Sequence, residues 1–452
     1  MKVDVLVAEI GSTTTIVNAF NLFQEPLGFL GKGYSRTTVE TDVTIGLKKA
    51  IENLKINLNV NDIDYQEMFA TSSAAGGLKM TVHGLVYEMT AKAAKQAALN
   101  AGANIHLVTA NLIEDSDIEK IKAIHPNIIV VAGGTDYGEK EVAYQNLLKL
   151  KDLNIPMIYS GNIQNHDRIK ALNIMHLRIV ENVYPRVDDF NILPLRKAIY
   201  ETFEENIVHA KGMHKINDMI NGHIIPTPGS VMETTLLLND LIKGVMTIDV
   251  GGATTDVHSV CEPNQIYQKY HDGEPLFKRT VEGDLGVYIN RNLVYAQSRK
   301  TKINQTMHME EESILRILKE ASYIPETDQG KQLIDLLTEV CVEKALDRHV
   351  GDLKRVFTTN GMKVIPDGKD ASQVQAIFLT GGACLYHDGI EPFIRNYLEQ
   401  SVTKLVPNHH VKIYKDQKYL FSSLGVLSLN YREEVKQMLR DMFNIKEDKD
   451  VS

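Results

Sequence analysis

Three kinds of segment are missing from this chain of 452 residues, and each absence excludes a class of protein. No run of about 18 apolar residues occurs, so no membrane-spanning helix is expected. No Lys/Arg-rich block occurs, and 49 basic against 58 acidic residues give a net charge of −9, which argues against nucleic acid as the main partner. The N-terminal apolar run contains Asp4 and Glu9, so it does not resemble a signal peptide. We therefore expect a cytoplasmic protein that binds neither membranes nor nucleic acid.

Cysteine is scarce as well. The three cysteines, Cys261, Cys341 and Cys384, are far apart and form no CxxC pair, so we expect them to be reduced core residues. No catalytic triad, zinc-ligand spacing or calcium loop is present, and the 15 histidines are scattered. His409 and His410 precede an expected strand and are interpreted as surface residues. The common hydrolase and metal-binding motifs therefore do not supply the chemistry of this chain.

What the sequence does contain is one unusual turn, present twice. Residues 6–20 read LVAEIGSTTTIVNAF, and residues 246–260 read MTIDVGGATTDVHSV. Each copy is an apolar β-branched run, then an acid, a glycine, small hydroxylated residues and a second β-run. When the copies are aligned, four positions agree in kind: Glu9 with Asp249, Gly11 with Gly251, Thr14 with Thr254, and Thr15 with Thr255.

This composition suits a turn that surrounds an anion. Glycine allows a close approach of the backbone, and backbone N–H groups with Ser/Thr hydroxyls can surround phosphate oxygens. A single turn of this kind is more often a plain hairpin than a phosphate site. Two copies in register favour two similar domains that close on one nucleotide, ATP or ADP. The expected phosphate-binding residues are Gly11, Ser12, Thr13, Thr14, Gly251, Gly252, Thr254 and Thr255.

Three carboxylates, those of Glu9, Asp249 and Asp256, are the candidate catalytic groups. Mg²⁺ is usually held by one or two carboxylates, waters and substrate phosphates. We therefore expect Glu9 and Asp249 to bind Mg²⁺ through water. One of the three acids could orient or deprotonate an attacking water.

The order of segments predicts an α/β protein of two or three domains. We expect a first domain of residues 1–103 and 185–240, an inserted unit of residues 104–184, and a second domain of residues 241–452. The inserted unit has four short apolar runs that predict a small parallel Rossmann-like sheet: 105–108, 127–134, 155–161 and 176–180. Elsewhere, helices are predicted near 42–55, from a cap at Thr90 to a stop at Gly102, within 185–223, and at 308–322, 328–350 and 432–443.

Three further glycine clusters are weaker candidates. Gly381, Gly382 and Ala383 follow an expected strand, where a base or ribose could lie against bare backbone. Gly283 and Gly286 flank Asp284 before an expected helix, where amides could meet phosphates. Gly133 and Gly134, followed by Asp136, lie at the expected ligand edge of the inserted sheet, but no full GxGxxG is present. A second ligand site there remains an open alternative.

The order of these pieces resembles the actin-like ATPase superfamily, which includes acetate and sugar kinases, heat-shock chaperones and actin. The first hairpin resembles its phosphate-1 motif, TIDVGGATTD (247–256) its phosphate-2 motif and LTGGA (379–383) its adenosine motif. TPGSVMETTLLL (227–238) and LFSSLGVLSL (420–429) resemble its two connecting helices. The resemblance implies an actin-like fold of two related domains with an inserted Rossmann-like subdomain.

Within that superfamily the whole chain resembles the MutL/GlmL family, whose members accompany adenosylcobalamin-dependent mutases and aminomutases and are unrelated to mismatch-repair MutL. TSSAAGGLKMTVHGLV (71–86), PTPGSVME and VEGDLGV carry this resemblance. VDVLVAEIGSTTT is similar to the GlmL-related branch associated with ornithine degradation. The resemblance implies a reactivating chaperone, with ornithine aminomutase as one possible partner, that uses ATP to release damaged cobalamin.

Two departures from the superfamily pattern concern hydrolysis. The first acid is usually Asp, whereas this chain has Glu9, and the Lys that many relatives place seven residues later is replaced by Ile16. Slow turnover suits a molecular switch. A small-molecule kinase, with Asp249 or Asp256 over a substrate hydroxyl, and a nucleotide-bound scaffold that does not hydrolyse remain alternatives. A homo-oligomer is also possible.

Overall fold

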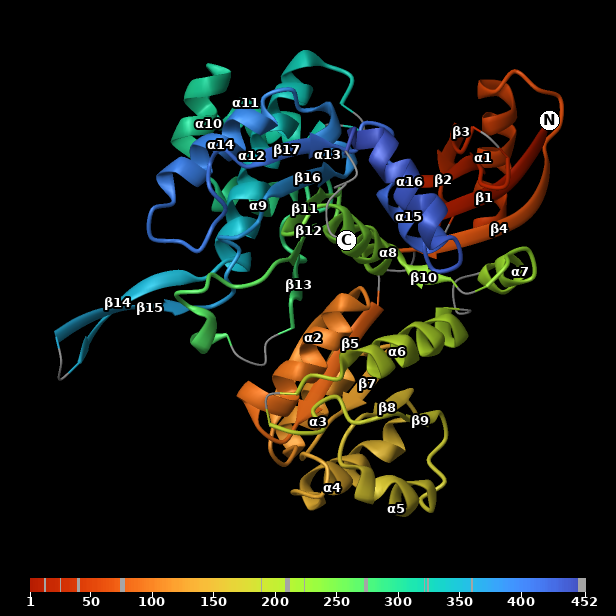
Figure 1. Cartoon of the computed structure of the whole chain (residues 1–452). Coiled ribbons are helices and arrows are strands. Elements are labelled where there is room, and N and C mark those ends of the chain that lie inside the picture. Colours follow the sequence, from red (N-terminus) through yellow and green to blue (C-terminus); the bar gives the residue numbers. More distant parts are fainter. Residues whose placement is uncertain are drawn as a thin grey trace, which may run out of the picture. The chain divides into compact units, whose positions relative to one another are not determined.

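The computed structural model divides into two compact units, which are described separately (Figure 1). Unit 1 comprises Met1–Thr234, Gly273–Pro275 and Leu420–Ser452, and unit 2 comprises Thr235–Asp272 and Leu276–Tyr419. The structure describes residues 1–11, 14–24, 26–38, 41–73, 78–187, 189–207, 212–222, 224–271, 275–320, 322, 325–358 and 361–445. Within these residues, no helix is both long and apolar enough to span a bilayer.

The first sheet of unit 1 has the strand order β10-β4-β1-β2-β3. At its centre β1 (Lys2–Ile10) pairs antiparallel with β2 (Thr14–Asn21) and parallel with β4 (Asp64–Ser72). The outer strands are β3 (Gly28–Arg36), antiparallel to β2, and β10 (Ile225–Pro226), parallel to β4. Every residue of β1 after Lys2 is buried, as expected for the near-continuous apolar run of a central strand.

The sheet of unit 2 repeats this pattern in the order β13-β12-β11-β16-β17. Its central strand β11 (Val245–Val250) pairs antiparallel with β12 (Thr255–Val260) and parallel with β16 (Ala376–Thr380). β13 (Phe277–Glu282) is antiparallel to β12, and β17 (Lys412–Lys415) is parallel to β16. The two sheets therefore share strand order and direction. This confirms the predicted α/β class with two related sheets, the architecture of the actin-like fold.

A third, fully parallel sheet lies in unit 1, in the order β6-β5-β7-β8-β9. Its strands are β5 (Leu78–Gly84), β6 (Ala103–Ala110), β7 (Ile128–Val131), β8 (Met157–Tyr159) and β9 (Leu177–Ile179). The four predicted strands are present. The expected boundary at residue 104 left out β5, which lies between β6 and β7. Polar Lys79, Thr81 and His83 alternate with its apolar residues, so β5 lacks the continuous apolar run typical of a buried parallel strand.

Helices cover both faces of this parallel sheet. On one face α3 (Asp115–Ile124), α4 (Glu141–Leu150) and α5 (His166–Lys170) enclose an apolar core with β7 and β8. On the other face lie α2 (Lys92–Asn100) and α6 (Ile192–Ile207). The strand order is that of a flavodoxin-like doubly wound sheet, in which the strand order reverses between β5 and its neighbour β7.

The predicted cap at Thr90 is wrong, because Thr90 is itself helical and lies four residues after Val86, the N-cap of the helical segment. A π-helical turn, η2 (Tyr87–Ala91), precedes α2, and the Thr90 hydroxyl accepts hydrogen bonds from Leu85 N (2.8 Å) and Val86 N (3.2 Å). A Thr at this spacing can bond to the preceding loop as readily as it caps a helix. The predicted stop at Gly102 is confirmed, because Gly102 follows the C-cap Ala101 with φ +90°.

The remaining elements complete the two units. Unit 1 also contains α1 (Val43–Asn57), α7 (Met213–Asn217), α15 (Phe421–Leu427), α16 (Arg432–Phe443), η3 (Lys151–Leu153) and η4 (Ile163–Asn165). α8 (Thr227–Leu241) runs from unit 1 into unit 2. Unit 2 contains η5 (Gln268–Tyr270), α9 (Arg291–Gln297), α10 (Lys300–Met307), α11 (Glu311–Glu320), α12 (Asp328–His349), α13 (Gly382–Tyr386), α14 (Ile390–Gln400) and the hairpin of β14 (Asp352–Thr358) and β15 (Gly361–Asp367). The buried side of α12 packs into the core of unit 2.

Candidate functional site

The hairpin between β11 and β12 is the best-defined part of the candidate site. Asp249 lies opposite Asp256 in the strand register, and Gly251 N donates to Thr254 O (2.9 Å), which closes the turn. The Thr255 hydroxyl is buried and donates to Leu285 O (2.6 Å). Gly251, Gly252 and Thr254 are partly exposed, so the turn itself faces outward while its base is anchored.

A second turn, residues 283–289, packs against this hairpin. Val287 N donates to Gly251 O (3.2 Å), and Tyr288 N and Ile289 N donate to Gly252 O at 2.9 and 2.7 Å. The structure therefore brings the predicted Gly283–Gly286 turn to the predicted phosphate turn, although about 30 residues of sequence separate them.

Asn290 joins the two turns through its side chain. Its Nδ2 donates to Ala253 O (2.8 Å) and to Gly283 O (2.9 Å). Gly286 is required for this close contact, because a Cβ there would lie 2.3 Å from the backbone of Ala253. The backbones of the two turns therefore pack directly against each other.

Arg348, on α12, fixes two carboxylates beside these turns, those of Glu282 and Asp284. Its guanidinium forms two parallel bonds with the Asp284 carboxylate (2.7 and 3.0 Å), and it also pairs with Glu282. The hydrogen bonds from Arg348 lower the pKa of Asp284 to about 2, whereas burial raises the pKa of Glu282. Gln297 also donates to Asp284 (2.9 Å). Asp284 is thus held ionised in a fixed position.

Asp256 lies in a buried ion pair. Arg279, fully buried on β13, donates to Asp256 Oδ1 from Nε (3.1 Å) and Nη2 (2.5 Å). The Thr254 hydroxyl donates to the other carboxylate oxygen at 3.3 Å. Both oxygens of Asp256 are therefore engaged, which fits a role in fixing the hairpin better than proton transfer.

Asp249 has a different environment, at the end of β11 beside β16. It is partly exposed and lies opposite Thr380 in the parallel register. Gly381 follows with φ +84°, and a Cβ there would lie 2.5 Å from Asp249 Oδ1. The Thr380 hydroxyl donates to the buried Asp416 at the end of β17 (3.1 Å).

The structure thus places Gly381, the first glycine of the predicted adenosine motif, beside Asp249. Gly382, at the start of α13, has open space where a Cβ would lie, and Ala383 follows it, partly buried against the core.

The hairpin of unit 1 has the same register. Glu9 lies opposite Ile16, and Gly11 N donates to Thr14 O (3.0 Å) as its counterpart does in unit 2. The predicted phosphate residues Ser12 and Thr13 lie outside the described residues. Glu9 is only 5% exposed, and the Ser422 hydroxyl of α15 donates to its Oε2.

Helix α15 is tied to the hairpin of unit 1 at a second point and crosses α8 closely. Asn18 Nδ2 donates to Ser423 Oγ (2.8 Å). Gly425 permits the crossing, because a Cβ there would lie 1.8 Å from Ser230 O. The two connecting helices predicted at 227–238 and 420–429 are therefore present.

The residues present fit a magnesium ion that is bound mostly by its own waters. No group of three or more His, Cys, Asp or Glu side chains in the described part of the chain could form a protein metal cage. Asp249 is partly exposed at the end of β11, where one carboxylate could contact the waters of such an ion. Mg²⁺ commonly keeps several waters and uses one or two carboxylates with substrate phosphates.

The glycines of the inserted sheet are explained by packing. A Cβ at Gly133 would lie 2.7 Å from Ala143 Cβ, and one at Gly134, where φ is +65°, would lie 1.8 Å from Glu139 O. Asp136 accepts hydrogen bonds from Ile163 N (3.0 Å) and Asn182 Nδ2 (2.9 Å). These residues shape the end of the sheet without forming a ligand cradle of their own.

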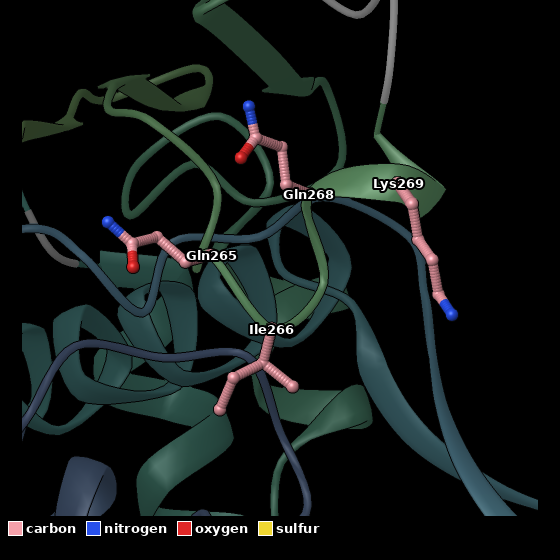
Figure 2. A pocket seen from close by; sticks show the side chains of 4 residues that line it. All are labelled: Gln265, Ile266, Gln268 and Lys269. Atoms are coloured by element: carbon pink, nitrogen blue, oxygen red, sulfur yellow. The ribbon is translucent and has the colours of Figure 1, made fainter.

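A surface hollow of about 370 Å³ lies elsewhere in unit 2. Figure 2 shows its lining, Gln265, Ile266, Gln268 and Lys269, with side chains that point apart from one another. All four come from one stretch after β12, and none is a predicted site residue. Specific ligand sites have convergent polar groups, so this hollow is not the functional site.

Sequence reasoning missed the residues that hold the site together. Arg279, Asn290, Arg348 and Ser422 contact groups 23, 37, 64 and 413 positions away, those of Asp256, Ala253, Asp284 and Glu9. Asp416 gave a usable signal, since an acid at the carboxyl end of a parallel strand lies at the ligand edge of a sheet.

Comparison with known proteins identifies the family of the chain. The family model described as "MutL protein" matches residues 5–443. "Protein MutL" from Clostridium tetanomorphum is 32% identical over 456 residues, which cover 96% of this chain and 98% of that protein.

Solved structures are similar only at a low level. The nucleotide-free structure of acetone carboxylase aligns with a TM-score of 0.40 and 12% identity, over 94% of this chain and 70% of that one. The activator of 2-hydroxyisocaproyl-CoA dehydratase from Clostridium difficile, with bound ADPNP, aligns with a TM-score of 0.32 and 9% identity over 99% of both chains. Similarities at this level do not bear on the assignment of a function.

Proposed function

The chain belongs to the MutL protein family, and we propose that it is an ATP-dependent reactivating chaperone for an adenosylcobalamin-dependent mutase or aminomutase. Ornithine aminomutase is the first candidate partner. The chaperone binds Mg²⁺ with ATP or ADP and releases damaged cobalamin from the partner, so that intact cofactor can enter.

The repeated hairpin is the observation that carries this proposal. In both units an acid ends the central strand, and a Gly N–H to Thr carbonyl bond closes the turn at nearly the same length, 3.0 Å in unit 1 and 2.9 Å in unit 2. Turns that expose backbone N–H groups and hydroxyls suit phosphate oxygens. We assign phosphate contacts to the two turns and to Gly283, and the base and ribose to the backbone of residues 381–383.

The two strand-end acids have different roles in this proposal. Asp249, beside bare backbone, orders waters of the magnesium ion. Glu9 is buried and already accepts a hydrogen bond from Ser422. It is therefore less able to accept a hydrogen bond from a metal-bound water. This supports slow hydrolysis, as a molecular switch requires.

A small-molecule kinase is the second candidate. Such an enzyme needs a carboxylate that can accept a proton from a substrate hydroxyl. The ion pair with Arg279 makes Asp256 poorly suited to this role, which leaves Asp249. A scaffold that binds nucleotide without hydrolysis is favoured by Ile16, which puts an apolar side chain opposite Glu9.

ATPase activity measured with and without an inactivated aminomutase separates the three functions. A reactivating chaperone should hydrolyse ATP slowly, respond to the inactivated partner, and restore its activity when fresh adenosylcobalamin is supplied. A phosphorylated small molecule formed at enzyme-like rates would establish the kinase instead. Tight Mg-ATP binding without any hydrolysis, with or without partner, would establish the scaffold.

A further inference from the structure

Exposed apolar side chains gather at one edge of the parallel sheet of unit 1. They follow four different strands: Val86 and Tyr87 after β5, Leu112 after β6, Tyr137 after β7 and Ile163 after β8. Tyr137 is 79% exposed and Tyr87 is 51% exposed. The carboxyl ends of parallel strands meet at one edge, so these five residues form one surface, which we call the apolar edge.

Hydrogen bonds hold the loops of the apolar edge together. Asn111 N donates to Gly84 O (2.9 Å) and Leu85 O (3.0 Å), which joins the loops after β6 and β5. The buried Asn162 accepts from Tyr137 N (3.4 Å) and donates to Gly138 O (3.1 Å), which joins the loops after β8 and β7. The surface is therefore pre-organised, and binding to it costs less conformational entropy.

Tyr137 is held in an unusual backbone conformation. Its φ is +64°, in the left-handed region that non-glycine residues seldom adopt. Asp136 beside it is fixed by Ile163 N and Asn182 Nδ2. Strain of this kind persists where the surroundings enforce it, and it is concentrated at functional sites. Here it presents a tyrosine ring to solvent.

Carboxylates border the apolar edge. The loops that follow the five strands (residues 85–91, 111–114, 132–140, 160–165 and 180–187) contain five acids and two cations. The acids are Glu88, Glu114, Asp136, Glu139 and Glu181, and the cations are Lys140 and Arg186. An apolar centre with an acidic border is complementary to an apolar centre with a basic border.

We propose that the apolar edge is the docking surface for the partner enzyme, at a patch of that enzyme with an apolar centre bordered by Lys and Arg. This inference rests on the proposed function. Tyrosine is enriched in the cores of protein interfaces. The acidic border disfavours polyphosphates, nucleic acids and anionic lipids. It also disfavours a two-fold contact of the edge with itself, because such a contact would put carboxylates opposite carboxylates.

Binding of the full-length chain to purified ornithine aminomutase, measured by biolayer interferometry at low and high salt, tests the docking surface. Tyr137→Asn removes the ring and keeps a residue that tolerates positive φ, and Ile163→Ser removes a second apolar side chain. Each should weaken binding about 10-fold or more, as truncation of a central interface residue does. Glu88→Lys, at an exposed acid of the border, should slow association and weaken its salt dependence.

Phe357→Ser is the matched control. Phe357 is 85% exposed on the β14–β15 hairpin of unit 2, so its loss removes a comparable exposed ring at another place. It should change binding less than 2-fold. Unchanged thermal unfolding and unchanged basal ATPase activity of the edge variants would show that the loss of binding is not a loss of fold.

The outcomes are distinct. Wild-type binding that is unaffected in Tyr137→Asn and Ile163→Ser would overturn the docking surface and leave the proposed function standing. No binding of the wild type to the aminomutase would overturn ornithine aminomutase as the partner and the apolar edge as its docking surface. Sedimentation velocity of the chain alone tests whether the apolar edge binds a second copy of the chain. Self-association that the edge variants abolish would show that it does.

Discussion

The two hairpin sheets can be compared position by position, because Glu9 lies opposite Ile16 in unit 1 as Asp249 lies opposite Asp256 in unit 2. Two residues further along the second strand, Asn18 of unit 1 corresponds to His258 of unit 2. Their neighbours on the third strand are Lys32 and Arg279. The backbone is repeated, but Ile16 stands where unit 2 has Asp256, and Asn18 stands where unit 2 has His258.

The two sheets differ in what their polar side chains contact. In unit 1 the polar groups of the sheet reach α15, through Glu9 with Ser422 and Asn18 with Ser423. In unit 2 the ion pair lies within the sheet: Arg279 on β13 pairs with Asp256, the counterpart of Ile16. The first hairpin is therefore coupled to a helix from the far end of the chain. The second hairpin is fixed from within its own sheet.

Replacing the buried arginine of unit 2 should have the largest effect. Arg279→Met leaves the buried Asp256 carboxylate without its cation, which should lower the free energy of unfolding by about 3–5 kcal/mol. Urea unfolding followed by circular dichroism measures the loss, and hydrogen exchange should locate it in unit 2. Lys32→Met, at the equivalent half-buried position of unit 1, should change stability by less than about 0.5 kcal/mol.

A double variant tests the cause of that loss. Arg279→Met with Asp256→Leu removes both charges and should recover most of the stability, because an apolar pair of similar volume often replaces a buried ion pair without cost. A double variant as unstable as Arg279→Met alone would show that packing, and not the unpaired carboxylate, causes the loss.

The hydrogen bond between Ser422 and Glu9 comes second in size. Ser422→Ala removes a donor from a buried carboxylate, which should cost about 1.5–3 kcal/mol. Glu9→Asp shortens the acid by one methylene, loses the same bond and should also change the rate of ATP hydrolysis. The two losses should not add in the double variant, since one bond is removed in both. Additive losses, measured by urea unfolding, would contradict a direct coupling of the hairpin to α15.

Much of the fold was predictable because the duplicated turn fixes where two central strands end. The helices at 328–350 and 432–443 were predicted to within one residue of α12 and α16. Three of the missed strands, β3, β14 and β15, have weak strand patterns. β3 contains three glycines, and β14 and β15 form a hairpin with exposed apolar residues.

The candidate site was predictable only in part, for a physical reason. Acids and glycines at strand ends reveal themselves by local pattern, as with Asp249 and Gly381. The groups that orient them act through tertiary contacts: Ser422 is 413 positions from Glu9, and Arg348 is 64 positions from Asp284. No local pattern shows that Asp256 is neutralised by Arg279, and this contact decides its role.

The two strand-end acids should also differ in their effect on metal binding. Asp249→Asn removes an acceptor for metal-bound water, which should weaken the apparent affinity for Mg²⁺ with ATP roughly 10- to 100-fold, or about 1.4–2.7 kcal/mol. Titration calorimetry of Mg-ATP measures it. Asp328→Asn, an exposed acid at the start of α12, is the control and should have no effect. An unchanged affinity in Asp249→Asn would mean that the metal site lies elsewhere.

The position shared by Asn18 and His258 gives the smallest effect, a change in the pH dependence of stability. His258 is fully buried, and burial together with the nearby Arg279 holds its pKa well below the usual value of 6.5. Below about pH 6.5 the unfolded chain binds a proton at His258 that the folded chain does not bind. The free energy of unfolding therefore falls as the pH drops below about 6.5. His258→Asn, which copies unit 1, should reduce this slope by up to about 1.4 kcal/mol per pH unit. His410→Asn removes an exposed histidine of the same unit and should leave the slope unchanged. Urea unfolding at pH 7.5, 6.5 and 5.5 measures both. Equal slopes in wild type and His258→Asn would show that folding does not lower the pKa of His258.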